Sequence, residues 1–176
     1  MTESDMLRLA KAFWEIALWR RTPAQLPASS FLLALVAVAA ALLEVLSAFL
    51  PPVSSDRIFT RIVLSVAMPL GFAWAVLALA RHRQRFLQTG IALLGVGVLA
   101  ELVLYPIGSL IHVIGSDRLG AIPLGILMLL GLIWYLLACA NIWRAALDSG
   151  LSLGVVVSVA YLLLSIALEQ QLLPDT

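Results

Sequence analysis

Five long apolar stretches, joined by short connections, are the feature that most constrains this 176-residue chain. A helix rises ~1.5 Å per residue and the hydrocarbon core of a bilayer is ~30 Å thick, so about 20 apolar residues cross it. We therefore expect an all-α integral membrane protein, with five transmembrane helices in a compact bundle. The predicted spans cover residues 30–50, 62–80, 88–113, 121–140 and 151–168.

Composition agrees with a membrane location and excludes several classes of function. Charged residues make up 12% of the chain, against about 25% in soluble domains. The formal net charge is +1 and the basic residues are scattered, so no nucleic-acid surface is predicted. The single cysteine, Cys139, excludes an internal disulfide. Two histidines and isolated acids predict no metal site, no cofactor and no catalytic centre.

The N-terminal part of the chain differs from the rest. Residues 1–28 are predicted to form an amphipathic helix and a proline-rich linker ahead of the transmembrane domain, residues 29–176. The helical pattern runs from Ser4 to Arg21, with a narrow polar stripe opposite an apolar face. With Trp14 and Trp19 as anchors, we expect this helix to lie in the plane of the lipid headgroups with its apolar face in lipid.

Basic residues are distributed unevenly between the two sides of the predicted bundle. The side that carries the N-terminus holds eight Lys and Arg residues and the other side three, together the eleven of the chain. This asymmetry predicts a cytoplasmic N-terminus and an external C-terminus. The densest basic turn contains Arg81, Arg83 and Arg85, which are also predicted contacts for anionic lipid headgroups.

Two glutamates lie deep in the apolar stretches. Glu44 and Glu101 each lie 14 residues past the start of a span, counted from Ser30 and Leu87, so they share a depth and could face one another. A charge at the bilayer centre costs at least ~2.5 to 3.5 kcal/mol, so such groups are paired or protonated. One interpretation is structural pairing, with Arg61 reaching Glu44. The alternatives are a pathway for protons or cations and a contact to a substrate.

Small residues predict a packing surface on the last span. Gly150, Gly154 and Ser158 recur every fourth residue, which makes a groove where another backbone can approach closely. The groove can serve packing within the bundle or the seam of a homodimer.

Three stretches resemble the bacterial branch of the Yip family of five-span membrane proteins. They are IWYLLACANIWRAALDSGLSLGVVVSV at Ile133–Val159, RFLQTGIALLG at Arg85–Gly95, and Tyr105 followed by Pro106. The proline-terminated amphipathic N-terminus is also similar. The resemblance implies five spans, an inside N-terminus, a bacterial inner membrane and a role in membrane organisation or partner recruitment. It implies no catalytic residue.

The leading functional hypothesis from the sequence is a non-enzymatic membrane protein that organises lipid or recruits partners through its helix faces and N-terminal arm. Its expected partners are the lipid bilayer, including anionic lipid, and a second copy of the chain or another membrane protein. The alternative is a small carrier or channel for protons or ions that uses Glu44 and Glu101.

The charge asymmetry generates a topology prediction. Reporters fused after Arg85 and after Leu147 should be cytoplasmic, and reporters fused near Arg57 and at Thr176 should be external. Enzymatic reporters that are active on only one side of the membrane measure this directly. A cytoplasmic reporter at Thr176 would contradict the five-span topology.

Overall fold

The computed structural model describes residues 3–47, 55–115 and 120–173, with side chains from residue 10 and, in the second range, from residue 57. All described secondary structure is helical, as predicted. The six α-helices are α1 (Glu3–Ala17), α2 (Ser30–Ser47), α3 (Ser55–Leu79), α4 (Phe86–Ile114), α5 (Ala121–Leu147) and α6 (Leu151–Leu172), and the two short 3-10 helices are η1 (Pro23–Gln25) and η2 (Arg83–Arg85).

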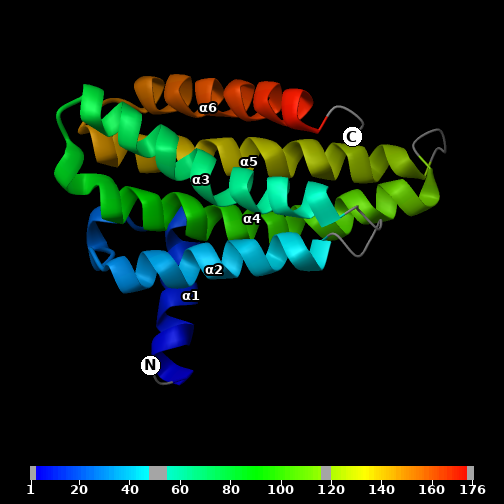
Figure 1. Ribbon diagram of the computed structural model, residues 1–176, viewed down its shortest axis with the longest axis horizontal. Helices are drawn as coiled ribbons and strands as arrows, with labels where there is room; N and C mark the ends of the chain where they lie inside the picture. Colours follow the sequence, from blue (N-terminus) through cyan, green and yellow to red (C-terminus); the bar gives the residue numbers. More distant parts are fainter. Residues whose placement is uncertain (1–2, 48–54, 116–119, 174–176) are drawn as a thin grey trace.

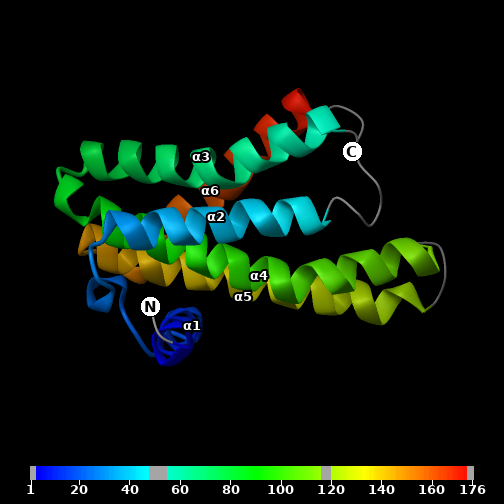
Figure 2. The same cartoon turned by 60° about the horizontal axis from the view of Figure 1, so that its bottom comes forward.

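Helices α2 to α6 lie side by side along the long axis of the molecule, whereas α1 stands nearly perpendicular to them (Figure 1). Figure 2 views α1 almost along its own axis, which confirms the perpendicular crossing. Each of the five long helices is long and apolar enough to cross a membrane. The architecture is therefore that of a multi-pass membrane protein. We call the end with the Arg81–Arg85 turn and the α5–α6 connection the basic end, and the opposite end the far end.

The helix bounds differ from the predicted spans in several places. Helix α3 begins at Ser55, well before residue 62, and α6 continues to Leu172 instead of ending at residue 168. Apolar length predicts the part of a helix that lies in lipid, but the backbone stays helical into the interface where polar side chains are tolerated. The predicted end of the first span, residues 48–50, lies outside the described residues.

Three helices end at residues with a positive φ that are not glycine. Trp19, Arg81 and Asp148 have φ values of 64°, 61° and 54°. In each case the next residue donates its N–H to the carbonyl five residues earlier, at 2.8 to 3.1 Å, which is the Schellman type of helix end. Because of this turn, α1 ends at Ala17 and not at Arg21 as predicted. Such a backbone costs roughly 1 to 2 kcal/mol in a residue with a Cβ.

The small-residue groove predicted on the last span is used inside the bundle. A Cβ added to Gly154 would collide with the backbone of Ala140, so α5 and α6 are in direct backbone contact there. Ser158 is buried beside it and donates its hydroxyl to the Gly154 carbonyl at 2.9 Å. Gly150 is exposed at the start of α6. Among the described residues, the groove therefore packs one helix pair of the same chain.

Helix α1 docks on the bundle through part of its apolar face. Phe13 fills the notch left by Gly95 of α4, and Ile16 and Ala17 are fully buried. The indole N–H of Trp134 in α5 donates to the Ala17 carbonyl at 3.1 Å. The expectation that this whole face lies in lipid was therefore wrong, because α4 and α5 cover its described core.

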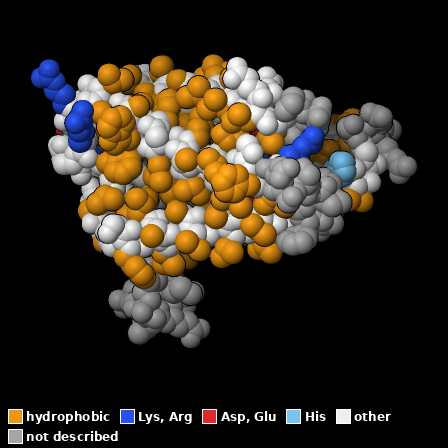
Figure 3. Space-filling view, viewed as in Figure 1, with side chains coloured by type: hydrophobic (Ala, Val, Ile, Leu, Met, Phe, Trp, Pro, Cys, Tyr) orange, Lys and Arg blue, Asp and Glu red, His pale blue; other side chains and the backbone are white. Residues whose placement is uncertain are grey.

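The exposed part of α1 carries the predicted aromatic anchors. Trp14 and Trp19 are 46% and 44% exposed, and the ring of Trp14 lies 6.3 Å from that of Trp134. On the bundle itself, hydrophobic side chains are spread over the face in Figure 3, and Lys and Arg side chains stand at its left edge, the basic end, and also toward the far end. A helix across the bundle with exposed tryptophans fits a position at the membrane interface.

The fit of Phe13 against Gly95 predicts that a larger residue at position 95 displaces α1. Gly95→Val should weaken docking by about 1 to 3 kcal/mol, because the aromatic ring leaves no room for the added atoms. Faster trypsin cleavage at Arg20 or Arg21 would report the release. Gly97→Val is the matched control, since nothing lies within 4 Å of a Cβ at that position. Equal cleavage of the two variants would contradict the docking geometry.

Candidate functional site: a carboxylate cavity

A cavity of about 350 Å³ lies between α2, α3, α4 and α6, in the half of the bundle toward the far end. It is lined by three carboxylates, one guanidinium, and hydroxyl and apolar side chains. They are Glu44, Ser47, Arg61, Leu64, Ser65, Met68, Glu101, Tyr105, Tyr161, Ser165 and Glu169. We call this space the carboxylate cavity.

The structure places the three ionisable residues singled out from the sequence around this one space. Glu44 is within Coulombic range of Arg61 and Glu169, and Glu101 is within range of Glu44 and Arg61. Among the described residues, no ion pair of 4.0 Å or less joins Arg61 to these carboxylates. The Nε of Arg61 is buried and has no hydrogen-bond partner there. These groups thus surround an open space instead of closing on one another.

Sequence reasoning missed most of the wall contributed by α6. Tyr161, Ser165 and Glu169 line the cavity, although the predicted span ended just before Glu169. Their spacing of four residues places them on one face of a helix. The same spacing relates Arg61 to Ser65 on α3. Polar residues four apart on several spans were the signal that could have found this cavity.

A smaller chamber of about 150 Å³ continues the cavity inward. It shares Ser65, Glu101 and Tyr161 with the carboxylate cavity and reaches Tyr135 of α5. Tyr135 lies near Tyr161 and near the Cys139 thiol. Polar groups therefore extend from the carboxylates to the centre of the bundle.

Toward the basic end this polar path meets closely packed aromatic and aliphatic side chains. The ring of Phe72 lies 5.7 Å from that of Trp143 and 5.4 Å from that of Tyr161. Beyond them, Leu77 and Ile142 are fully buried. The carboxylate cavity is thus closed toward the basic end.

Hydrogen bonds fix the helices that carry the carboxylates. The Tyr105 hydroxyl of α4 donates to the Ser47 carbonyl at the end of α2, at 2.7 Å. The Ser47 hydroxyl in turn donates to the Glu44 carbonyl at 2.9 Å. These contacts hold the Glu44 segment of α2 against the helix that carries Glu101.

Three carboxylates against one guanidinium leave an excess of negative charge when all are ionised. Glu44 and Glu101 lie within the spans and are partly buried, whereas Glu169 is exposed near the end of α6. Because a charge in an apolar slab is unstable without a partner, the two carboxylates within the spans favour a proton or a bound cation. Among the described residues, no group of three His, Cys, Asp or Glu side chains is arranged to hold a metal ion. The chemistry that this site offers is the uptake of positive charge.

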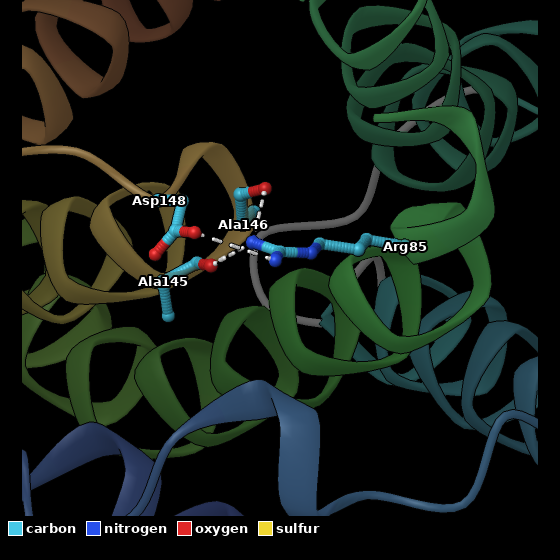
Figure 4. A network of polar contacts seen from close by, with 4 residues as sticks. All are labelled: Arg85, Ala145, Ala146 and Asp148. Atoms are coloured by element: carbon cyan, nitrogen blue, oxygen red, sulfur yellow. Dashed lines mark hydrogen bonds and ion pairs between the residues drawn. The ribbon is translucent and has the colours of Figure 1, made fainter. Parts of the chain in front are cut away.

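The basic residues predicted to contact lipid headgroups lie in different environments. Arg81 and Arg83 are exposed, and the Arg83 guanidinium lies 5.8 Å from the centre of the Trp74 ring. Arg85 instead turns inward, and its Nη1 donates to the carbonyls of Ala145 and Ala146 at the end of α5 (Figure 4). Part of its donor capacity is thus used within the protein.

Comparison of the chain with models of known families, with curated proteins and with solved structures gave no match. The resemblance to the Yip family stays a prediction from the sequence.

The geometry predicts that water reaches the α6 wall of the cavity. In a Cys139→Ala background, Ser165→Cys should react with a charged, membrane-impermeant thiol reagent added on the far-end side only, because Ser165 lines the cavity. Ser158→Cys is the control, since Ser158 is 1% exposed against α5. Equal labelling of both positions, or none at Ser165, would contradict a hydrated cavity.

Proposed function

We propose that this multi-pass membrane protein reversibly takes up protons or a small cation in the carboxylate cavity, as a carrier or a receptor for positive charge. The observation that carries the proposal is the convergence of Glu44, Glu101 and Glu169, from three helices, on one space that holds a single guanidinium, Arg61. Serine and tyrosine hydroxyls in the same wall are suitable ligands or hydrogen-bond partners for such an occupant.

The charge balance supports uptake of positive charge over a purely structural pairing. A structural pair brings an arginine and a carboxylate into contact, with their hydrogen bonds made. Here the buried Nε of Arg61 has no partner, and the carboxylates outnumber the guanidinium. A site built in this way lowers its free energy when a cation or a proton enters.

The closed side of the cavity supports a carrier or a receptor over an open pore. Packing around Phe72 and Trp143 separates the cavity from the basic end, so one side only has access. Helix α3 contains Pro69 and, two residues later, Gly71, and it bends near its middle (Figure 2). A proline removes a helical hydrogen bond, which makes this bend a suitable hinge for changing access.

This proposal reverses the order of the two hypotheses drawn from the sequence. A pathway needs several polar residues along one face, and Glu169, Ser165 and Tyr161 supply them. Membrane organisation or partner recruitment remains the second candidate, favoured by the exposed Trp14 and Trp19 of α1. In a bacterial inner membrane with the N-terminus inside, the carboxylate cavity opens to the external side.

Purified protein in liposomes tests the function. The wild type should carry a proton or monovalent-cation flux, and Glu101→Gln should reduce it to the level of empty liposomes, because an amide cannot take up and release a proton as a carboxyl does. Glu44→Gln and Glu169→Gln should also lower the flux.

The control for these variants is Glu15→Gln, which makes the same chemical change on α1, where Glu15 pairs with Arg21 at 3.0 Å. It should leave the flux intact. If the wild type binds a cation without transporting it, binding of the cation at equilibrium should be measured in place of flux. The three cavity variants should then bind less cation than the wild type, and Glu15→Gln should bind as much. Neither flux nor binding in the wild type would overturn the proposal.

A further inference from the structure

A second polar cavity, of about 450 Å³, lies at the basic end, separate from the carboxylate cavity. It forms where the linker between α1 and α2 meets the start of α4 and the end of α5. The side chains that matter for its chemistry are Thr22, Arg85, Gln88, Arg144, Asp148 and Ser149. We call this space the basic cavity.

Arg85 is held in place on one side of the basic cavity. Its Nη1 donates to the carbonyls of Ala145 and Ala146 at 2.9 and 3.2 Å, and its Nη2 lies 3.7 Å from Asp148 (Figure 4). The Asp148 side chain is 80% exposed, so this long ion pair contributes little. A guanidinium has five N–H donors, and those on Nε and Nη2 remain for another acceptor.

The rest of the wall adds donors. Arg144 lines the cavity and, among the described residues, forms no ion pair or hydrogen bond through its guanidinium. The Ser149 hydroxyl is buried and has no partner there. Gln88 fixes the linker by donating to the carbonyls of Ala24 and Leu26 at 3.2 and 3.0 Å. Two guanidiniums and a free hydroxyl therefore face one space with a single, outward carboxylate.

We propose that the basic cavity binds the phosphate group of an anionic membrane lipid, through Arg85 and Arg144 with Ser149 as an additional donor. Guanidinium groups match phosphate with paired, charge-assisted hydrogen bonds, and a fixed guanidinium loses little freedom on binding. This assignment differs from the headgroup contact predicted for the basic turn, because Arg81 and Arg83 do not line the cavity.

The position of the basic cavity favours lipid as the source of the phosphate. It adjoins the linker that follows α1, and α1 crosses the bundle with exposed tryptophans, as a helix at the headgroup level does. Anionic headgroups are concentrated at this level, and basic residues near the surface are attracted to them. The proposal does not depend on the function of the carboxylate cavity.

Native mass spectrometry of the full-length protein, released from equal mixtures of phosphatidylglycerol and phosphatidylcholine, tests the proposal. The wild type should retain phosphatidylglycerol preferentially. Arg144→Gln should weaken that retention about fivefold or more, and the fold should be spared because the Arg144 guanidinium forms no other ion pair or hydrogen bond among the described residues. Arg20→Gln is the control, with the same loss of charge at an exposed residue of the same end that lies outside the cavity.

A second arm identifies the source of the phosphate. Inorganic phosphate, added to protein in phosphatidylcholine alone, should raise the unfolding temperature less than phosphatidylglycerol does if the site takes a lipid headgroup. An equal effect would assign the cavity to soluble phosphate instead. If Arg144→Gln and Arg20→Gln lose phosphatidylglycerol equally, the lipid is held only by general attraction to the basic surface, and the proposed site is wrong. The absence of any preference for phosphatidylglycerol in the wild type would overturn the proposal as well.

Discussion

Close approach at small residues holds this bundle together. Helices in lipid gain no hydrophobic free energy by contacting one another, so their association depends on van der Waals packing and on hydrogen bonds between them. Small residues give that packing here: Gly154 admits the α5 backbone, Gly95 admits the ring of Phe13, and Gly131 admits the side chain of Leu104. These close contacts determine which helices lie next to each other more than the large apolar side chains do, because an apolar side chain can face lipid or protein at similar cost.

The two polar cavities lie on either side of a closely packed region in the basic half. Ile91, Val96 and Ile142 are fully buried there, at levels typical of a soluble core. Toward the far end, cavities of about 350 and 380 Å³ form, and both contact Glu101.

Apolar length predicted the helical class and the number of spans, because the thickness of the hydrocarbon core sets a minimum length for a helix that crosses it. The position of Glu44 and Glu101 along their spans also predicted that they share a depth, with Arg61 within reach of Glu44. Periodicity could not decide whether protein or lipid covers the apolar face of α1, since both are equally apolar. It therefore misplaced Phe13 and Ile16, which pack on α4 and α5.

Other features depend on contacts between distant parts of the chain. Arg85 bonds carbonyls 60 and 61 residues away, and carbonyls carry no sequence signature, so its inward orientation was invisible from the basic turn alone. Glu169 was missed for a related reason. It follows the last apolar residue of the predicted span, and only the continued helix of α6 turns it toward Glu44.

The internal space of the carboxylate cavity has a mechanical consequence. Closely packed protein is nearly incompressible, whereas a region with internal space can change its cross-section at low cost. The helices around the carboxylate cavity can therefore change their separation more easily than the closely packed region around Ile91, Val96 and Ile142. A change in the lateral pressure of the surrounding lipid would then alter the separation of α2, α3 and α6, and with it the distances among the three carboxylates.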